Sequence, residues 1–260
     1  MSALSNGAAP QAILRTRRLT KRFGGLVVTD QLDLEVRPGE VHAVIGPNGA
    51  GKTTLINQLA GEIAPDLGAV EFDGRDITRL PTFRRALLGL SRSYQITSVF
   101  GDFTALDNVC LAAQAHDGHS FGFWRPARDD AALTARGRQA LAEVGLAARS
   151  GSPAGVLAHG ERRQLELAMA LVSRPKLLLL DEPMAGMGRQ ESERMVRLLE
   201  RLKGAYAMLL VEHDMDAVFA LADRITVLVY GRSVASGAGH DIRSNAEVRK
   251  AYLGERHAAR

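Results

Sequence analysis

One segment restricts what this chain can fold into more than any other. Residues 46–53 read Gly-Pro-Asn-Gly-Ala-Gly-Lys-Thr, the phosphate-loop pattern of a glycine, four residues, a glycine, a lysine and then serine or threonine. An apolar run, Val41–Ile45, leads into it, and Leu55, Ile56 and Leu59 follow at helical spacing. The segment is therefore predicted to join a buried strand to a helix.

The glycines and the lysine of this loop indicate its chemistry. Glycines let successive backbone N–H groups point inward at phosphate oxygens, with the positive end of the following helix behind them. Lys52 then reaches the β- and γ-phosphates, and the Thr53 hydroxyl is placed to ligate Mg²⁺. An ordinary glycine-rich turn is disfavoured, because pattern and context agree. We assign to nucleotide binding Gly46, Pro47, Asn48, Gly49, Ala50, Gly51, Lys52, Thr53 and Thr54.

A phosphate loop alone is compatible with kinases, GTPases, helicases and transport ATPases, and a pair of carboxylates narrows this choice of protein class. The apolar run Leu177–Leu180 ends in Asp181 and Glu182. Ligands of parallel sheets bind at the carboxyl ends of the strands, so Asp181 fits the Mg²⁺ shell and Glu182 fits a base that polarises the attacking water. The alternative is that Asp-Glu-Pro only begins a helix.

The rest of the chain alternates short apolar runs with helical stretches, which favours βαβ units and a doubly wound α/β core. Strands are predicted at Ala207–Val211 and Ile225–Tyr230, the latter entering a closing hairpin. From Leu106 to Ala148 strand signals vanish, which predicts an inserted helical lobe. Further helices are predicted at Arg163–Val172, Arg189–Leu202, Met215–Ala222 and Glu247–Leu253.

Composition excludes several classes of protein. The net charge of +4 comes from scattered arginines without a block of like charges, which is typical of a solvated surface rather than a nucleic-acid site. A single cysteine, Cys110, allows no internal disulfide and suits a reducing compartment. Met1–Pro10 does not read as a secretory signal, and no apolar run approaches the roughly 20 residues that span a bilayer.

The segment before the acidic strand carries a family resemblance. Residues 157–164 read Leu-Ala-His-Gly-Glu-Arg-Arg-Gln and resemble the signature of ATP-binding cassette transporter subunits, although relatives usually have Ser-Gly-Gly after the leucine. The resemblance implies a phosphate-loop NTPase core with a parallel sheet, an antiparallel β subdomain and an inserted helical lobe at about residues 96–160. It also implies one ATPase domain over residues 12–256, after a tail at 1–11.

The same resemblance implies roles for residues outside the phosphate loop. Gln95 is similar to the glutamine that contacts Mg²⁺ and the attacking water, and His213 is similar to the switch histidine that reaches the γ-phosphate. Phe23 matches an aromatic residue that stacks on adenine, with core packing as its alternative. Gly188 stands where relatives commonly have an aspartate. The signature residues, which hold the γ-phosphate bound by the opposite subunit, are Ala158, His159, Gly160 and Glu161.

Four segments resemble one branch of the family. They are Phe23–Gly25, Ala185–Met187, Val211–Met215 and Ala251–Glu255, and they look like the ATPases of importers for branched-chain and other amino acids or amides. The resemblance implies ATP and Mg²⁺ as cofactors. It implies two direct partners, a membrane permease and a second ATPase subunit that is identical or different, and an indirect link to a substrate-binding protein. It also implies a peripheral location on the cytoplasmic face of the inner membrane. No nucleic-acid partner is expected.

Three alternatives to this function remain open at the level of sequence. A lipopolysaccharide-export ATPase shares a similar tail, a soluble cassette ATPase would act in DNA repair or translation, and a regulatory module would only bind nucleotide. One further segment, 96–103, mixes apolar Val99, Phe100 and Phe103 with polar neighbours. We expect part of it to receive a short permease helix, unless these side chains pack inside the lobe.

Overall fold

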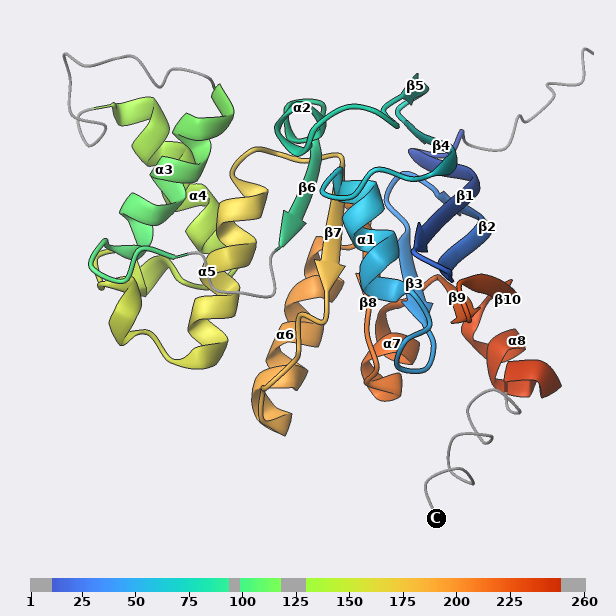
Figure 1. Cartoon of the computed structure of the whole chain (residues 1–260). Coiled ribbons are helices and arrows are strands. Elements are labelled where there is room, and N and C mark those ends of the chain that lie inside the picture. The colour runs from blue at the N-terminus through green and yellow to red at the C-terminus, as the bar shows by residue number, and fades with distance from the viewer. Residues whose placement is uncertain (1–10, 94–98, 118–129, 249–260) are drawn as a thin grey trace, which may run out of the picture.

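The computed structural model describes residues 11–93, 99–117 and 130–248 of the chain. Within these ranges the centre is a six-stranded sheet in the order β10-β9-β3-β8-β7-β6 (Figure 1). All neighbouring strands are parallel except β10, which is antiparallel to β9. The strands are β3 (Val41–Ile45), β6 (Leu90–Ser93), β7 (Leu177–Asp181), β8 (Ala207–Val211), β9 (Arg224–Val229) and β10 (Arg232–Gly237).

The burial of the middle strands explains why they are visible in the sequence. Every residue of β3, β7 and β8 is buried, so these strands carry continuous apolar runs, and the predicted strands are confirmed. The predicted end of the last strand is wrong by one residue. Tyr230 lies in the turn after β9 with φ 48°, because a two-residue hairpin turn needs a positive φ at this position.

Helices cover the sheet, and their predicted positions are largely confirmed. The exception is Arg163–Val172, because the helix begins four residues earlier, where the Glu161 carboxylate accepts the Ala158 N–H and closes the first turn. The predicted helix Glu247–Leu253 falls mainly outside the described residues. None of the helices in the described ranges has the length and apolarity needed to cross a membrane. The helices are α1 (Lys52–Ala60), α5 (His159–Leu171), α6 (Arg189–Leu202), α7 (Met215–Leu221) and α8 (Gly239–Ser244).

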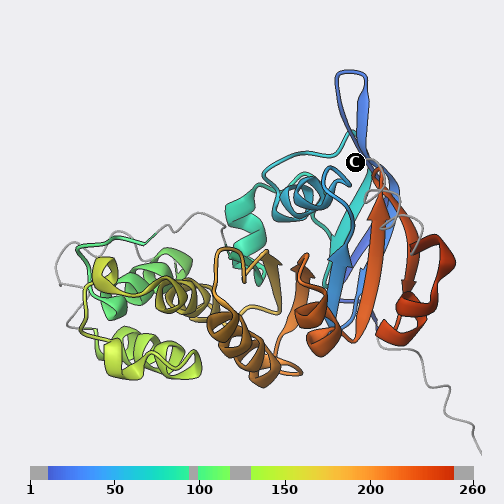
Figure 2. The same cartoon turned by 90° about the horizontal axis from the view of Figure 1, so that it is seen from below.

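A second, antiparallel sheet lies beside β3, as the resemblance implied. Its order is β2-β1-β4-β5, and its first two strands form the long hairpin seen at the upper right of Figure 2. Leu14, Leu19 and Leu32 of this hairpin are buried in the same core cluster as Val44 and Leu55, which joins the two sheets. The strands are β1 (Leu14–Phe23), β2 (Leu26–Val36), β4 (Leu67–Phe72) and β5 (Arg75–Asp76).

A buried arginine anchors the end of the helix that follows the phosphate loop. Arg85 lies in α2 (Thr82–Leu87) and is 1 % exposed. Its Nη1 donates to the carbonyls of Gln58 and Leu59 at 2.8 and 2.7 Å, so it satisfies acceptors that the end of α1 leaves open. Burial lowers the pKa of Arg85 to about 10, which leaves it charged at neutral pH.

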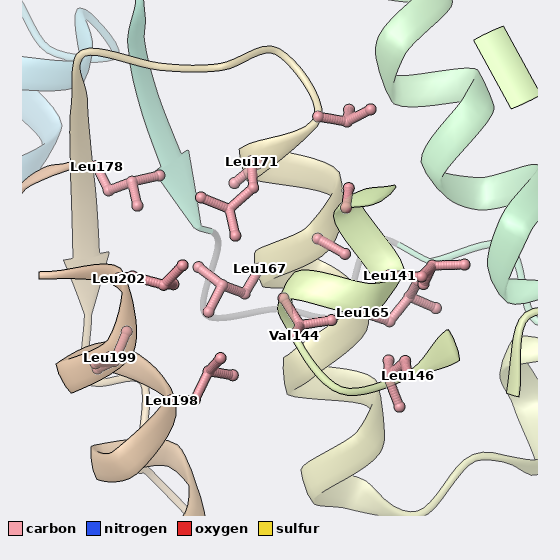
Figure 3. Packing of buried hydrophobic residues seen from close by; sticks show 14 of the residues in the cluster. Leu141, Val144, Leu146, Leu165, Leu167, Leu171, Leu178, Leu198, Leu199 and Leu202 are labelled. Atoms are coloured by element: carbon pink, nitrogen blue, oxygen red, sulfur yellow. The ribbon is translucent and has the colours of Figure 1, made fainter. Parts of the chain in front are cut away.

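The helical lobe stands at one side of the molecule, at the left of Figure 1. It contains α3 (Ala105–Asp117), α4 (Ala131–Glu143) and the short 3₁₀ helices η2 (Ala147–Arg149) and η3 (Ala154–Val156). Figure 3 shows Leu141, Val144 and Leu146 of the lobe facing Leu165 of α5. Leu167 and Leu171 of α5 continue the same cluster toward α6 and β7, so α5 ties the lobe to the core.

Candidate active site

Glycine is required at two positions of the phosphate loop. Gly46 has φ 156° and Gly51 has φ 99°, both positive values that residues with a side chain rarely adopt. A Cβ at Gly46 would lie 2.2 Å from the carbonyl oxygen of Leu228, and one at Gly51 would lie 2.3 Å from that of Val28. The loop is therefore held tightly between β9 and β2, while Asn48 and Gly49 at its tip stay exposed.

Lys52 is buried beneath this loop. Its side-chain ammonium donates to the carbonyls of Gly46 and Pro47 at 2.6 and 2.9 Å, and the residue is 8 % exposed. The next residue, Thr53, is exposed in the first turn of α1. A phosphate group at the loop would thus meet a desolvated cation, the open N-terminus of α1 and an accessible hydroxyl.

The two predicted carboxylates lie at the carboxyl end of β7, and β8 separates β7 from β3 (Figure 1). Asp181 is 3 % exposed and pairs in register with Val211 of β8. Glu182 donates its N–H to the Val211 carbonyl at 2.9 Å and has φ 49°, a left-handed conformation that is uncommon for glutamate. Such strain clusters at functional sites, because the surrounding structure has to impose it.

Arg92 was not predicted from the sequence, and it joins three elements of the site. Its guanidinium lies 3.1 Å from Asp181 Oδ2 and 2.9 Å from Glu62 Oε2, and it donates to Asn57 Oδ1 of α1 at 2.7 Å. Burial raises the pKa of the Asp181 carboxyl, and the positive charge of Arg92 opposes that rise. A charged residue inside a strand-like run, three positions before Gln95, was the signal that could have found it.

His213 reaches the same region from the next strand. It follows β8 and is exposed, with Nδ1 3.9 Å from Glu182 Oε1. Asp214 then caps α7 by accepting the N–H groups of Asp216 and Ala217, so His213 stands in a short connection that is fixed at both ends. The structure therefore brings together two side chains that are 31 residues apart in the sequence.

The signature segment occupies another part of the surface. Ala158 precedes α5 and makes no side-chain cap, and the adjoining hollow of about 240 Å³ is lined by α5 and α6 residues that include Glu161 and Glu191. Figures 1 and 2 both show α5 on the opposite side of β6 and β7 from α1. The structure thus separates the signature of this chain from its own phosphate loop.

The aromatic ring predicted to stack on adenine lies near the tip of the β1–β2 hairpin. Phe23 is 49 % exposed, and Lys21 Nζ lies 5.5 Å from its ring centre. Its ring is available for stacking, and core packing is not what the structure shows. Gln95, the other residue expected beside the nucleotide, lies outside the described residues.

The donor groups at the loop and at β7 suit Mg²⁺. The Thr53 hydroxyl and the Asp181 carboxylate are hard oxygen donors. In the part of the chain that the structure describes, no group of three or more His, Cys, Asp or Glu side chains could hold a metal ion. Mg²⁺ commonly binds through one or two protein oxygens together with substrate phosphates and water. The donor set therefore fits a metal that binds together with a nucleotide.

Comparison with known proteins decides the family. Residues 29–185, more than half of the chain, match the family described as ABC transporter. The chain belongs to the ABC transporter family. Residues 232–258 also match a family described as branched-chain amino acid ATP-binding cassette transporter. Membership in the ABC family confirms the predicted ATPase class and nucleotide binding.

Relatives of this ABC protein align with it along almost its whole length. It is 38% identical to the high-affinity branched-chain amino acid transport ATP-binding protein BraF of Pseudomonas aeruginosa, over 94% of this chain and 98% of BraF. It is 36% identical to LivG of Escherichia coli, over 94% of this chain and 99% of LivG. A solved ATP-binding cassette in its ADP conformation is 28% identical with a TM-score of 0.83, covering 94% and 99% of the two chains. The predicted fold class is confirmed.

Proposed function

We propose that this cassette hydrolyses ATP with Mg²⁺ to power an importer of branched-chain amino acids or of a related amino acid or amide. The observation that carries the substrate class is the match of residues 232–258 to the branched-chain amino acid family. The similarity to BraF and LivG, both branched-chain amino acid transport proteins, supports it. The same match favours import over the lipopolysaccharide-export alternative, and no observation favours a soluble or purely regulatory cassette.

Each residue of the site has a chemical role in this proposal. Lys52 and the loop N–H groups bind the phosphates. Thr53 and Asp181 would hold Mg²⁺, which would supply positive charge next to the phosphate oxygens. Glu182 accepts a proton from the attacking water, and His213 donates to the γ-phosphate. Gln95, which lies outside the described residues, would contact the metal and the water. Phe23 stacks on adenine, and its exposed ring is consistent with that role.

The cassette works as a dimer with an identical or a related ATPase. The signature residues Ala158, His159, Gly160 and Glu161 form the start of α5. Because α5 lies on the opposite side of β7 from α1 in Figure 1, these residues are suited to the nucleotide of a second subunit. The first turn of α5 presents N–H groups to that nucleotide. The Glu161 carboxylate, however, accepts the Ala158 N–H at 2.9 Å and thereby competes with a phosphate for this donor.

The permease docks on the apolar patch formed by Phe100, Phe103 and Val156. These side chains are 54, 47 and 66 % exposed, and the two rings lie 5.4 Å apart between centroids. Gly155 N–H donates to the Gly101 carbonyl at 2.9 Å and brings η3 against the loop. Val99 packs against the core cluster that includes the lobe, so among the described residues of 96–103 the alternative of internal packing applies to Val99. Docking here makes the cassette a peripheral subunit on the cytoplasmic face of the inner membrane.

Affinity capture from native membranes tests this proposal. The tagged chain is expected to bring down permease subunits and a second ATPase, and cells with the chain are expected to take up labelled leucine. Phe100→Asp places a charge in the patch, so the variant should bind nucleotide normally but capture less permease. Leu26→Asp is the matched control, since Leu26 is 66 % exposed on the antiparallel sheet. Capture of nucleic acid without a permease would support the soluble class instead.

A further inference from the structure

A buried carboxylate at the carboxyl edge of the sheet has no role in the reaction described above. Glu212 is 1 % exposed and follows β8 directly. Its Oε1 accepts the N–H of Met184 at 3.1 Å, and its Oε2 accepts the N–H groups of His213 and Asp214 at 2.9 and 3.2 Å. One side chain therefore binds the loop after Glu182 and the loop that carries His213.

The hydrogen-bond donors around Glu212 account for the residue type at this position. All three partners are N–H groups, and a carboxylate is a side chain that only accepts. A buried carboxylate is costly unless such hydrogen bonds satisfy it. Among the described residues, the basic side chain within 4 Å of Glu212 is that of His213, whose Nδ1 lies 3.7 Å from Oε2 and which forms an ion pair only when protonated. Hydrogen bonding to backbone is thus the main interaction that keeps this carboxylate in the core.

The bonds of Glu212 act where the backbone is strained. Glu182 has φ 49°, and its carbonyl accepts the N–H of Ala185 at 3.0 Å, so a tight turn follows it. The Met184 N–H that Glu212 binds lies inside this turn. On the other side, Glu212 and the Asp214 cap hold the two ends of the connection that contains His213.

We propose that Glu212 is a positioning residue that sets the placement of Glu182 relative to His213. It does not touch nucleotide. It holds two loops in one arrangement, so that the base and the γ-phosphate donor face the same point when ATP binds. This inference rests on the roles proposed for Glu182 and His213.

The test is Glu212→Gln, because the amide keeps the size of the side chain and places an NH₂ group against backbone donors. It is made in the full 260-residue chain that also carries Glu182→Gln, so that ATP binds without turnover. Glu40→Gln is the matched control. Glu40 is 9 % exposed at the opposite end of the sheet and accepts the Arg37 N–H at 2.6 Å.

Two measurements separate positioning from general stability. Affinity for ATP should fall by about ten- to a hundredfold in Glu212→Gln, the loss expected for charge-assisted hydrogen bonds, while ADP affinity stays unchanged. Amide hydrogen exchange should become faster at Met184, His213 and Asp214 but not at the start of β3. Glu40→Gln should change neither the ATP preference nor these amides.

Each result of these measurements supports or overturns the inference. An unchanged preference for ATP over ADP in Glu212→Gln, or an equal loss of that preference in Glu40→Gln, would overturn it. If Glu212→Gln does not fold, Glu212→Asp keeps the charge on a shorter side chain and is expected to show the same selective loss. Failure to capture a permease would count against the proposed importer and leave this inference standing, because both measurements need only the chain itself.

Discussion

The two ends of the central sheet both carry buried polar side chains, but these bind different partners. At the amino end His42 is 1 % exposed, its Nδ1 donates to the Glu35 carbonyl at 2.9 Å, and its Nε2 accepts from the Thr226 hydroxyl at 2.8 Å. That hydroxyl lies 2.8 Å from the hydroxyl of Ser236, and nearby Glu40 pairs with Arg224. The amino end is thus held largely by contacts between side chains of β3, β9 and β10.

At the carboxyl end two buried charges, Lys52 and Glu212, bind the backbone of the loops that carry site residues. Lys52 donates to two carbonyls of the phosphate loop, and Glu212 accepts from two loops. The proposed base and the proposed γ-phosphate donor remain accessible, since the side chains of Glu182 and His213 are 28 and 66 % exposed. Burial and full hydrogen bonding therefore do not distinguish a site from a scaffold. What distinguishes the site is that its buried charges hold loops around accessible reactive groups.

The largest effect that would test this contrast is expected from Glu182→Gln. Loss of a catalytic base should lower turnover by about two or more orders of magnitude, while nucleotide affinity and the free energy of unfolding stay unchanged. Steady-state hydrolysis and chemical denaturation measure these quantities. Glu193→Gln on the exposed face of α6 is the control. Unchanged hydrolysis in Glu182→Gln would show that the carboxyl end does not use this base.

At the amino end the expected effect is on stability and depends on pH. Burial lowers the pKa of His42 to about 4, below the value of 6.5 that it has when unfolded. The unfolded chain thus binds the proton more readily, so the stabilisation is complete above pH 6.5 and is lost as pH falls toward 4. The loss is on the order of 2 kcal/mol at about pH 4.5.

Denaturation at neutral and acidic pH measures this effect against His42→Asn. Carboxylates also titrate in this range, so the relevant quantity is the difference between the two chains. The variant should be less stable at neutral pH but should lose less on acidification. Equal pH dependence in both chains would contradict the assignment of a neutral, buried His42, and would weaken the view that this end of the sheet is a scaffold.

The sequence predicted the carboxyl end far better than the amino end, for a physical reason. Phosphate binding needs a glycine loop, a lysine and a carboxylate at fixed places along the chain, so Lys52 and Asp181 are visible as local patterns. His42 and its partner Thr226 are 184 positions apart, and no local rule specifies their contact. Arg92 was missed for the same reason, since its partners Asp181 and Glu62 lie far from it in the sequence.

The helices and strands were likewise predicted well where the signal is local and less well where it depends on a specific contact. Strands buried on both faces were found because a short apolar run between turn signals is typical of such a strand, as β3 and β8 show. The start of α5 was misplaced, because His159 and Gly160 are weak helix formers and only the contact of Glu161 with the Ala158 N–H begins the helix there. Gln95 stays a prediction, because it lies outside the described residues.

The smallest expected effect concerns the signature, which extends the carboxyl-end site to a second subunit. Ala158 offers no hydroxyl, and Gly188 offers no carboxylate in the loop before α6. One hydrogen bond contributes about 0.5 to 1.5 kcal/mol net, so Ala158→Ser should raise ATPase activity by up to about tenfold in the half-site that this signature completes.

ATPase activity is measured for the chain alone and for its complex with the permease. Ala154→Ser is the control, because it places a new hydroxyl nearby at a buried position in η3. A gain only in the chain alone would indicate that a partner ATPase with a more complete signature normally serves the faster half-site. No gain in either setting would mean that the N–H groups of α5 suffice and that Ala158 is harmless. In that case the Glu161 carboxylate, which already occupies the Ala158 N–H, becomes the group to change next.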